Sequence, residues 1–134
     1  MGQAVAKRLT KDDTLILSFI RSAMTNLKRR CKGAPEGRFN RRSIDLDVDH
    51  DYLLGLWDDQ GGLCNLSGLP MDMSYDLSAR KCTGPNRLFY PSLDRIDSDL
   101  GYVPGNVQWV CMGINYLKNS CTDEQALEFL TALL

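Results

Sequence analysis

Apolar residues recur at helical spacing in the first third of the chain. Between residues 10 and 32 they predict one amphipathic helix, whose stripe consists of Leu15, Ile16, Phe19, Ile20, Ala23 and Leu27. Thr10 and Asp13 resemble a capping box at the start of this helix. Glycine and proline within residues 33–37 predict its end.

The hydrophobic period changes after residue 42. Residues 43–48 alternate, with Ile44, Leu46 and Val48 on one face, which predicts a short strand or an extended segment. Asp49 is a suitable N-cap for a second helix that runs to about residue 60, where two glycines end it.

The second half of the chain predicts two strands and two further helices. We expect a strand at residues 88–96, a polar turn at 97–101, a second strand at 107–111 and a helix at 112–119. Thr122 and Gln125 form a capping box for a last amphipathic helix, whose leucines and Phe129 supply apolar surface. This order of elements predicts an α+β fold, and a length of 134 residues suits a single domain.

Charge is segregated along the chain, although the net charge is only −1. Residues 1–42 carry eleven Lys and Arg against three Asp and Glu, whereas residues 43–134 carry five against fourteen. Two interpretations of the densest basic stretch stay open, a phosphate-binding face and a solvated helix end. The stretch contains Lys28, Arg29, Arg30, Lys32, Arg38, Arg41 and Arg42.

The apolar runs and the cysteines indicate the cellular compartment in which the protein is expected. No run approaches the ~20 apolar residues of a membrane span, and we see no export signal, so we expect a cytoplasmic protein without membrane contact. The five cysteines are an odd number without a CxxC pair, which argues against a disulfide framework. Most of them are expected to be reduced and buried.

Polar residues gather where the two later strands meet the helix that follows. Asp94 and Asn115 offer the oxygen ligands that Mg²⁺ prefers, and Lys118 lies one turn after Asn115 on the same helix face. Asn106 can brace the turn before the second strand. Hydrolysis of a phosphodiester needs such a cation, an activated water and donors that hold the phosphate. A purely structural interpretation, with Asp94 in a surface ion pair and the asparagines in turns and caps, stays open.

These residues resemble the HNH endonuclease family, also called ββα-metal or His-Me finger nucleases. The resemblance rests on residues 92–98 (SLDRIDS), the Gly101-Tyr102 pair, residues 105–111 (GNVQWVC) and the Asn115-x-x-Lys118 spacing. Residues 56–64 with Ser67-Gly68 resemble the helix and knuckle that precede such a site. The resemblance implies that Asp94 and Asn115 bind one Mg²⁺ or Mn²⁺, that Asn106 orients the loop and that Lys118 contacts phosphate.

Arg95 departs from the family pattern, because it occupies the position of the general-base histidine. Arginine stays protonated and cannot accept a proton from water, but it can bind a phosphate oxygen through two hydrogen bonds. His50, the only histidine, is a candidate for the base, with a capping or surface role as the alternative. Tyr90 and Tyr102 are further candidates.

The cysteines depart from the family pattern as well. Related proteins often hold a structural zinc between two CxxC knuckles, whereas this chain has Cys64-x-x-Ser67 and Cys111-x-x-Ile114. Two thiols cannot complete a four-ligand cage, so we expect no structural zinc. Cys64 and Cys111 are instead expected to lie close together as reduced core thiols.

Together these patterns predict a single HNH-like domain over residues 1–134. It would comprise a basic N-terminal helical extension (1–45), a nuclease core (50–120) and a C-terminal helix (122–134). The expected function is metal-dependent cleavage of DNA by a phage-type or restriction-like endonuclease, with a homodimer if both strands are cut. The basic stretch would bind the DNA backbone. Alternatives are a nucleic-acid-binding module that kept the fold without the chemistry, and a protein-binding inhibitor or adaptor.

Overall fold

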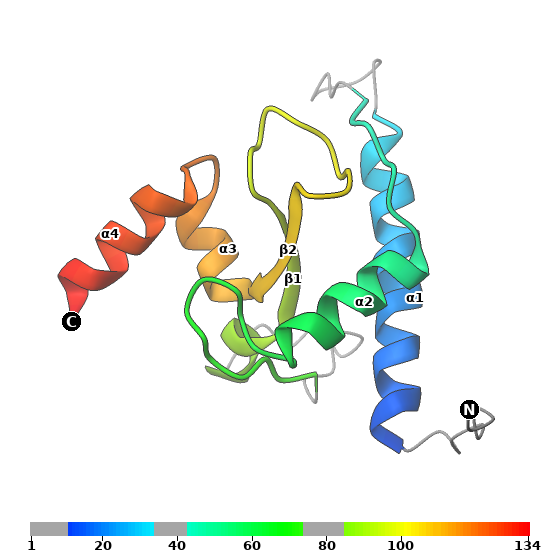
Figure 1. Cartoon of the computed structure of the whole chain (residues 1–134), viewed down its shortest axis with the longest axis horizontal. Coiled ribbons are helices and arrows are strands. Elements are labelled where there is room, and N and C mark those ends of the chain that lie inside the picture. Colours follow the sequence, from blue (N-terminus) through cyan, green and yellow to red (C-terminus); the bar gives the residue numbers. More distant parts are fainter. Residues whose placement is uncertain (1–10, 34–42, 74–84) are drawn as a thin grey trace, which may run out of the picture.

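The computed structural model describes residues 11–33, 43–73 and 85–134. These residues form a mixed α+β fold with four α-helices and a two-stranded antiparallel sheet (Figure 1). The elements in chain order are α1 (Lys11–Cys31), α2 (His50–Gln60), a short 3-10 helix η2 (Pro85–Phe89), β1 (Pro91–Arg95), β2 (Val107–Cys111), α3 (Met112–Lys118) and α4 (Asp123–Leu133).

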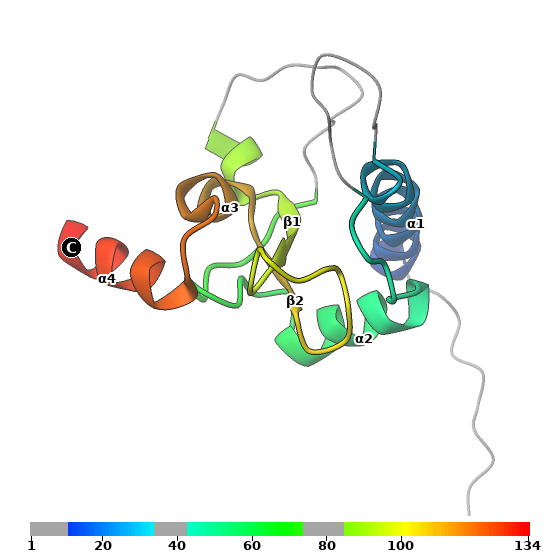
Figure 2. The ribbon, with the colours of Figure 1, turned by 90° about the horizontal axis from the view of Figure 1, so that it is seen from above.

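The sheet lies between α3 on one side and α1 on the other, as Figure 2 shows from above. Its register pairs Pro91 with Cys111 and Arg95 with Val107. Every residue of β2 is buried, and α3 follows it without a linker. β1, β2 and α3 therefore form one compact unit, in which side chains of α3 can reach β1.

Aromatic rings fill the space between this unit and α1. Phe19 of α1 lies 5.3 Å from Trp109 of β2 and 6.4 Å from Trp57 of α2, measured between ring centroids. Trp109 is 1% exposed and donates its indole N–H to the carbonyl of Leu53 at 3.0 Å. Burial of such rings supplies much of the apolar driving force for packing α1 and α2 on the sheet.

The helix boundaries agree with the sequence analysis. The helix predicted at residues 10–32 spans 11–31, although Thr10 of its predicted capping box lies outside the described residues. Asp49 caps α2 by accepting a hydrogen bond from the amide of Tyr52, and Gly61 ends it in the left-handed conformation. Thr122 and Gln125 form the predicted capping box of α4.

The strand predicted at residues 88–96 needs correction, whereas residues 43–48 take the extended form that the sequence also allowed. The strand expected at residues 88–96 begins only at Pro91, because residues 85–89 form η2, with Leu88 and Phe89 exposed. The alternating residues 43–48 are extended, and within the described residues they pair through one isolated bridge, between Leu46 and Tyr102. Next to that bridge the backbone of Gly101 lies against the segment 43–48, so closely that a Cβ added to Gly101 would lie 2.5 Å from the carbonyl oxygen of Asp45.

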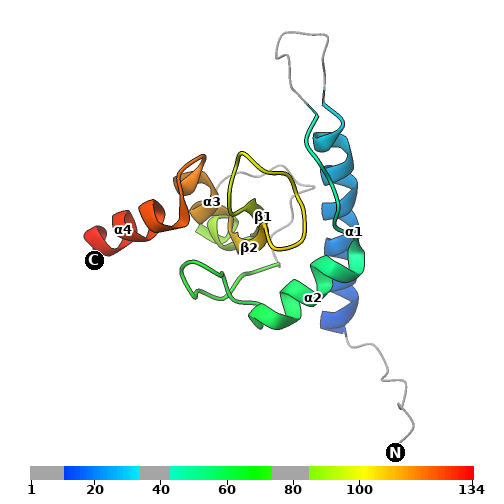
Figure 3. The ribbon, with the colours of Figure 1, turned by 45° about the horizontal axis from the view of Figure 1, so that its top comes forward.

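Helix α4 projects away from the sheet and packs mainly against α3 (Figure 3), while its first residue, Asp123, accepts a hydrogen bond from Gln108 of β2. Ala126 is buried and Leu130 packs on the core, whereas the other apolar residues predicted to supply packing surface are exposed, namely Leu127, Phe129, Leu133 and Leu134. None of the helices in the described ranges is both long and apolar enough to cross a membrane.

Candidate active site

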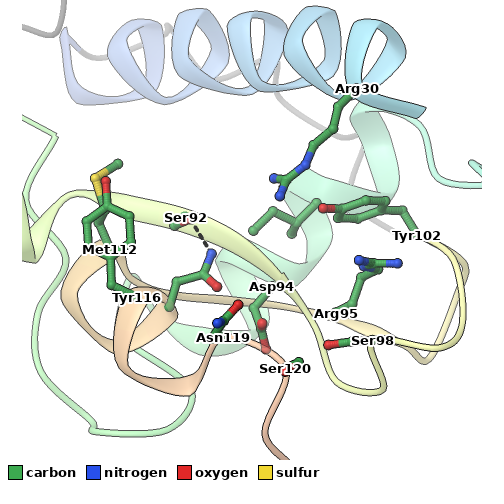
Figure 4. Close-up of a pocket in the computed structure, with 12 residues that line it drawn as sticks. Arg30, Ser92, Asp94, Arg95, Ser98, Tyr102, Met112, Tyr116, Asn119 and Ser120 are labelled. Carbon is green, nitrogen blue, oxygen red and sulfur yellow. Dashed lines mark hydrogen bonds between the residues drawn. The ribbon is translucent and has the colours of Figure 1, made fainter. Parts of the chain in front are cut away.

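A pocket of about 550 Å³ opens beside the β1–β2–α3 unit and below the C-terminal end of α1. Its polar lining comes from α1, β1, α3 and the two loops next to them, as Figure 4 shows. The polar residues that line it are Arg30, Ser92, Asp94, Arg95, Ser98, Tyr102, Asn115, Tyr116, Asn119 and Ser120. Asp94, Arg95 and Asn115, three of the residues predicted from the sequence, are thus brought together.

Asp94 lies on β1 with its side chain only 4% exposed. Its Oδ2 accepts hydrogen bonds from Lys118 Nζ at 2.5 Å and from Gln108 Nε2 at 3.0 Å. Its Oδ1 accepts no hydrogen bond from the part of the chain that the structure describes, and the side chain lines the pocket. One carboxylate oxygen is therefore held by the protein and the other is left for a ligand.

Asn115 reaches the same pocket from α3. Its Nδ2 donates to Ser92 Oγ at 2.7 Å, the bond drawn as a dashed line in Figure 4. Because the amide nitrogen faces β1, the Oδ1 is turned away from Ser92, and none of the described residues donates to it. Asp94 and Asn115 thus each present one unoccupied oxygen acceptor.

Lys118 is fully buried and does not line this pocket. Its ammonium contacts Asp94, lies 2.7 Å from Asp123 Oδ1 and donates to the carbonyls of Arg95 at 2.9 Å and Ile96 at 3.2 Å. Burial lowers the pKa of Lys118, but hydrogen bonds to Asp123 and Asp94 outweigh it and leave the pKa above its ordinary value. The predicted phosphate contact by Lys118 is therefore wrong, since this ammonium has no exposed surface to offer.

Gln108 and Asp123 complete the buried cluster around Lys118, and the sequence analysis missed both. Gln108 lies opposite Asp94 in the sheet and also donates to Asp123 Oδ1 at 3.2 Å. Its side-chain oxygen accepts from Asn65 at 2.7 Å. The available signal was a single polar residue in an otherwise apolar strand, because a buried amide needs partners.

Arg95 lines the pocket and is partly held within its own loop. Its Nη1 donates to the carbonyl of Leu100 at 3.1 Å, and its guanidinium lies 5.3 Å from the centroid of the Tyr102 ring. Neither Arg95 nor Arg30 forms an ion pair with a carboxylate among the described residues. Figure 4 shows the guanidinium groups of Arg30 and Arg95 near Tyr102, so two positive charges border the pocket that Asp94 also lines.

Asn106 is buried in the loop between the strands and makes the bracing contacts expected of it. Its Nδ2 donates to the carbonyls of Asp97 at 3.0 Å and Gly101 at 2.8 Å, and its Oδ1 accepts from the amide of Asp97 at 2.9 Å. The side chain does not line the pocket. Any contribution of Asn106 to chemistry therefore passes through the loop that carries Arg95.

The remaining predicted residues lie apart from the pocket or outside the described ranges. His50 is exposed as the first residue of α2 and does not line the pocket, which fits its surface alternative better than a general-base role. Of the basic residues predicted to bind DNA, Lys28, Arg29 and Arg30 are exposed on α1, and of these three only Arg30 reaches the pocket. Arg38, Arg41 and Arg42 lie outside the described residues.

Cys64 and Cys111, the remaining cysteines of the two incomplete CxxC knuckles, lie close together as expected. Both are buried and free, and they lie close enough for Cys64 to affect the pKa of the Cys111 thiol. Burial, together with the neighbouring Cys64, raises the pKa of Cys111 to about 11. Burial also acts to raise the pKa of Cys64, but hydrogen bonds from Ser67 and the nearby backbone outweigh it and leave that pKa lowered. Cys82 lies outside the described residues.

Metal ligands in this site would be few. The described residues contain no group of three or more His, Cys, Asp and Glu that could hold a metal ion. Mg²⁺ is commonly bound through one or two protein oxygens with water completing the shell, which matches the donor set of Asp94 and Asn115. No protein-family model, curated protein or solved structure matches this chain.

Proposed function

We propose that this protein is a metal-dependent endonuclease that hydrolyses DNA phosphodiester bonds with an HNH-like ββα-metal core. One observation carries the proposal: Asp94 and Asn115 present unoccupied oxygens in a pocket that also receives the guanidinium groups of Arg30 and Arg95. The first pair suits a hard divalent cation, and the second pair suits a phosphate. The succession of β1, β2 and α3 supports the ββα assignment.

Asp94 and Asn115 would hold the cation, Mg²⁺ or Mn²⁺. A bound cation supplies Lewis-acid stabilisation of charge on the scissile phosphate. The chain prepares the carboxylate for this task, because Lys118 and Gln108 hold Asp94 Oδ2 in place, while Oδ1 accepts no hydrogen bond from the described residues. Lys118 is therefore a positioning residue in this scheme, and Ser92 positions Asn115 in the same way.

Arg95 and Arg30 would bind the non-bridging oxygens of the phosphate and offset charge that develops there. Arg95 is oriented by Leu100 and Tyr102, and the loop that carries these residues is braced by Asn106. The exposed Lys28, Arg29 and Lys32 beside Arg30 would contact neighbouring phosphates. DNA affinity would then fall steeply as salt rises.

Plasmid nicking in Mg²⁺ or Mn²⁺ tests the proposal. Asp94→Asn keeps the shape of the side chain but removes the charge on the metal ligand, and we expect cleavage to fall by at least about 100-fold. Asp123→Asn removes a carboxylate from the same lysine without touching the pocket, and should cost far less activity. Equal losses in the two variants would show that the buried charge cluster, and not a metal ligand, is responsible. Cleavage that persists in Asp94→Asn would refute the metal assignment.

A nucleic-acid-binding module without chemistry is the second candidate, and Arg95 is the observation that favours it. The position that should hold a base carries a permanent cation, and the only histidine lies on the surface of α2. This candidate predicts salt-dependent DNA binding by the wild-type protein with no nicking in either metal. Nicking that depends on Asp94 excludes it.

A further inference from the structure

A second, smaller groove of about 210 Å³ adjoins the candidate active site. It runs between α1 and the start of β1 and shares five lining residues with the pocket, namely Arg30, Ser92, Leu93, Tyr102 and Met112. The groove and the pocket are therefore continuous. A ligand whose phosphate sits at Arg30 and Arg95 can extend directly into this groove.

The walls of the groove are aromatic and apolar. Phe19 and Tyr90 meet edge to face with their centroids 5.5 Å apart, and Trp109 lies behind Phe19. Ala23 lies between Phe19 and Leu27 on the α1 wall, and its small side chain leaves room in the middle of the groove. Flat, weakly polar ring systems bind well to such surfaces, because stacking and apolar burial act together.

The rim of the groove is polar. Ser22 and Asn26 are exposed on α1 one turn apart, and their side chains form no hydrogen bond with the other described residues. Arg30 continues the same face and forms the border with the candidate active site. The edge of a ring that enters the groove thus meets the hydrogen-bonding side chains of Ser22 and Asn26. The guanidinium of Arg30 lies at the end of the groove that faces the candidate active site.

We propose that this groove receives an unstacked nucleobase of the nucleotide next to the scissile phosphate, so that the substrate is single-stranded or unpaired DNA. The inference rests on the proposed function only in placing the phosphate at Arg30 and Arg95. A paired base is stacked in the duplex and cannot enter a groove between a helix and a strand unless it is extruded. Base stacking on aromatic side chains is also tolerant of sequence, so a preference for strand state is expected over a preference for sequence.

Binding without metal tests this inference separately from cleavage. We would measure Kd in EDTA for an oligothymidylate and for an abasic chain with the same number of phosphates. Stacking of one base predicts about tenfold tighter binding of the base-bearing strand. Equal affinities would overturn the proposal, because phosphate contacts alone would then account for binding.

Ala23→Phe and Thr25→Phe provide a matched pair of variants. Both add the same ring to α1, but Ala23 lines the groove and the exposed Thr25 does not. Ala23→Phe should abolish the preference for the base-bearing strand while leaving affinity for the abasic chain within about twofold. Thr25→Phe should retain the preference, and its loss in both variants would refute the assignment. If circular dichroism shows that Ala23→Phe does not fold, the affinities of the wild-type protein for the base-bearing and abasic chains still decide between the outcomes.

The two proposals fail differently. If the protein prefers the base-bearing single strand but nicks no DNA, the nucleobase groove is supported and the nuclease proposal is refuted. If nicking depends on Asp94 but the protein binds the base-bearing and abasic chains equally, the nuclease proposal is supported and the nucleobase groove is refuted. Cleavage of an oligonucleotide and of its blunt duplex adds a direct comparison, in which the single strand should be cut at least about tenfold faster.

Discussion

Replacing Lys118 with methionine should destabilise the protein strongly. Lys118 is 0% exposed, and among the described residues its ammonium is the only cation that forms an ion pair with Asp94 or with Asp123. Methionine has a similar length but no charge, so the variant would leave two carboxylates near each other with Gln108 as their shared donor. It would also remove the donor to the carbonyls of Arg95 and Ile96.

Removing one partner of a buried ion pair typically costs about 3–5 kcal/mol, because the remaining charge stays desolvated. That is a large share of the ~5–15 kcal/mol that holds a domain folded. For a chain of this size, the loss corresponds to a fall in Tm on the order of 10–20 °C. Urea and thermal unfolding followed by circular dichroism would measure it.

Two further variants make the prediction decisive. Lys28→Met removes the same charge from an exposed position on α1 and should change stability by less than about 0.5 kcal/mol. Adding Asp123→Asn to Lys118→Met should recover part of the loss, with a coupling of about 1 kcal/mol or more. Similar effects of Lys28→Met and Lys118→Met, or strict additivity with Asp123→Asn, would refute the reasoning from burial and charge.

Two other predictions concern alkaline pH and a close backbone contact. Because the folded pKa of Lys118 is raised, its stabilisation is complete below the unfolded pKa of about 10.4 and is lost as pH rises through the higher folded value. The stability gap between wild type and Lys118→Met should therefore narrow in urea titrations above about pH 10.5, and a gap that widens there would contradict this sign. Gly101→Ala should cost about 1–3 kcal/mol, because its Cβ would press on Asp45, whereas Gly55→Ala in α2 meets nothing within 4 Å and should be neutral or stabilising in the same unfolding assay.

Local patterns were sufficient to place the helices and one strand. The ends of α2 and α4 depend on caps a few residues away, so Asp49, Gly61 and Thr122 could be identified from neighbouring positions. The start of β1 could not be identified in this way, because Leu88 and Phe89 are apolar enough for a strand and yet belong to η2 in the structure. Residues 43–48 were ambiguous for the same reason, since pairing depends on a partner more than fifty residues away.

The sequence by itself brought Asp94, Arg95 and Asn115 to attention, because their types and spacing are local properties of two strands and a helix. Only the tertiary structure decided what each polar side chain faces. Lys118 and Asn115 share one helix face, yet the first is buried against Asp94 and Asp123 while the second opens onto the pocket. Arg30 joins the site from α1, more than sixty residues before Asp94 in the chain. The physical reason is that burial and charge pairing depend on all elements packed around a group, whereas helix period and capping depend on a few neighbours.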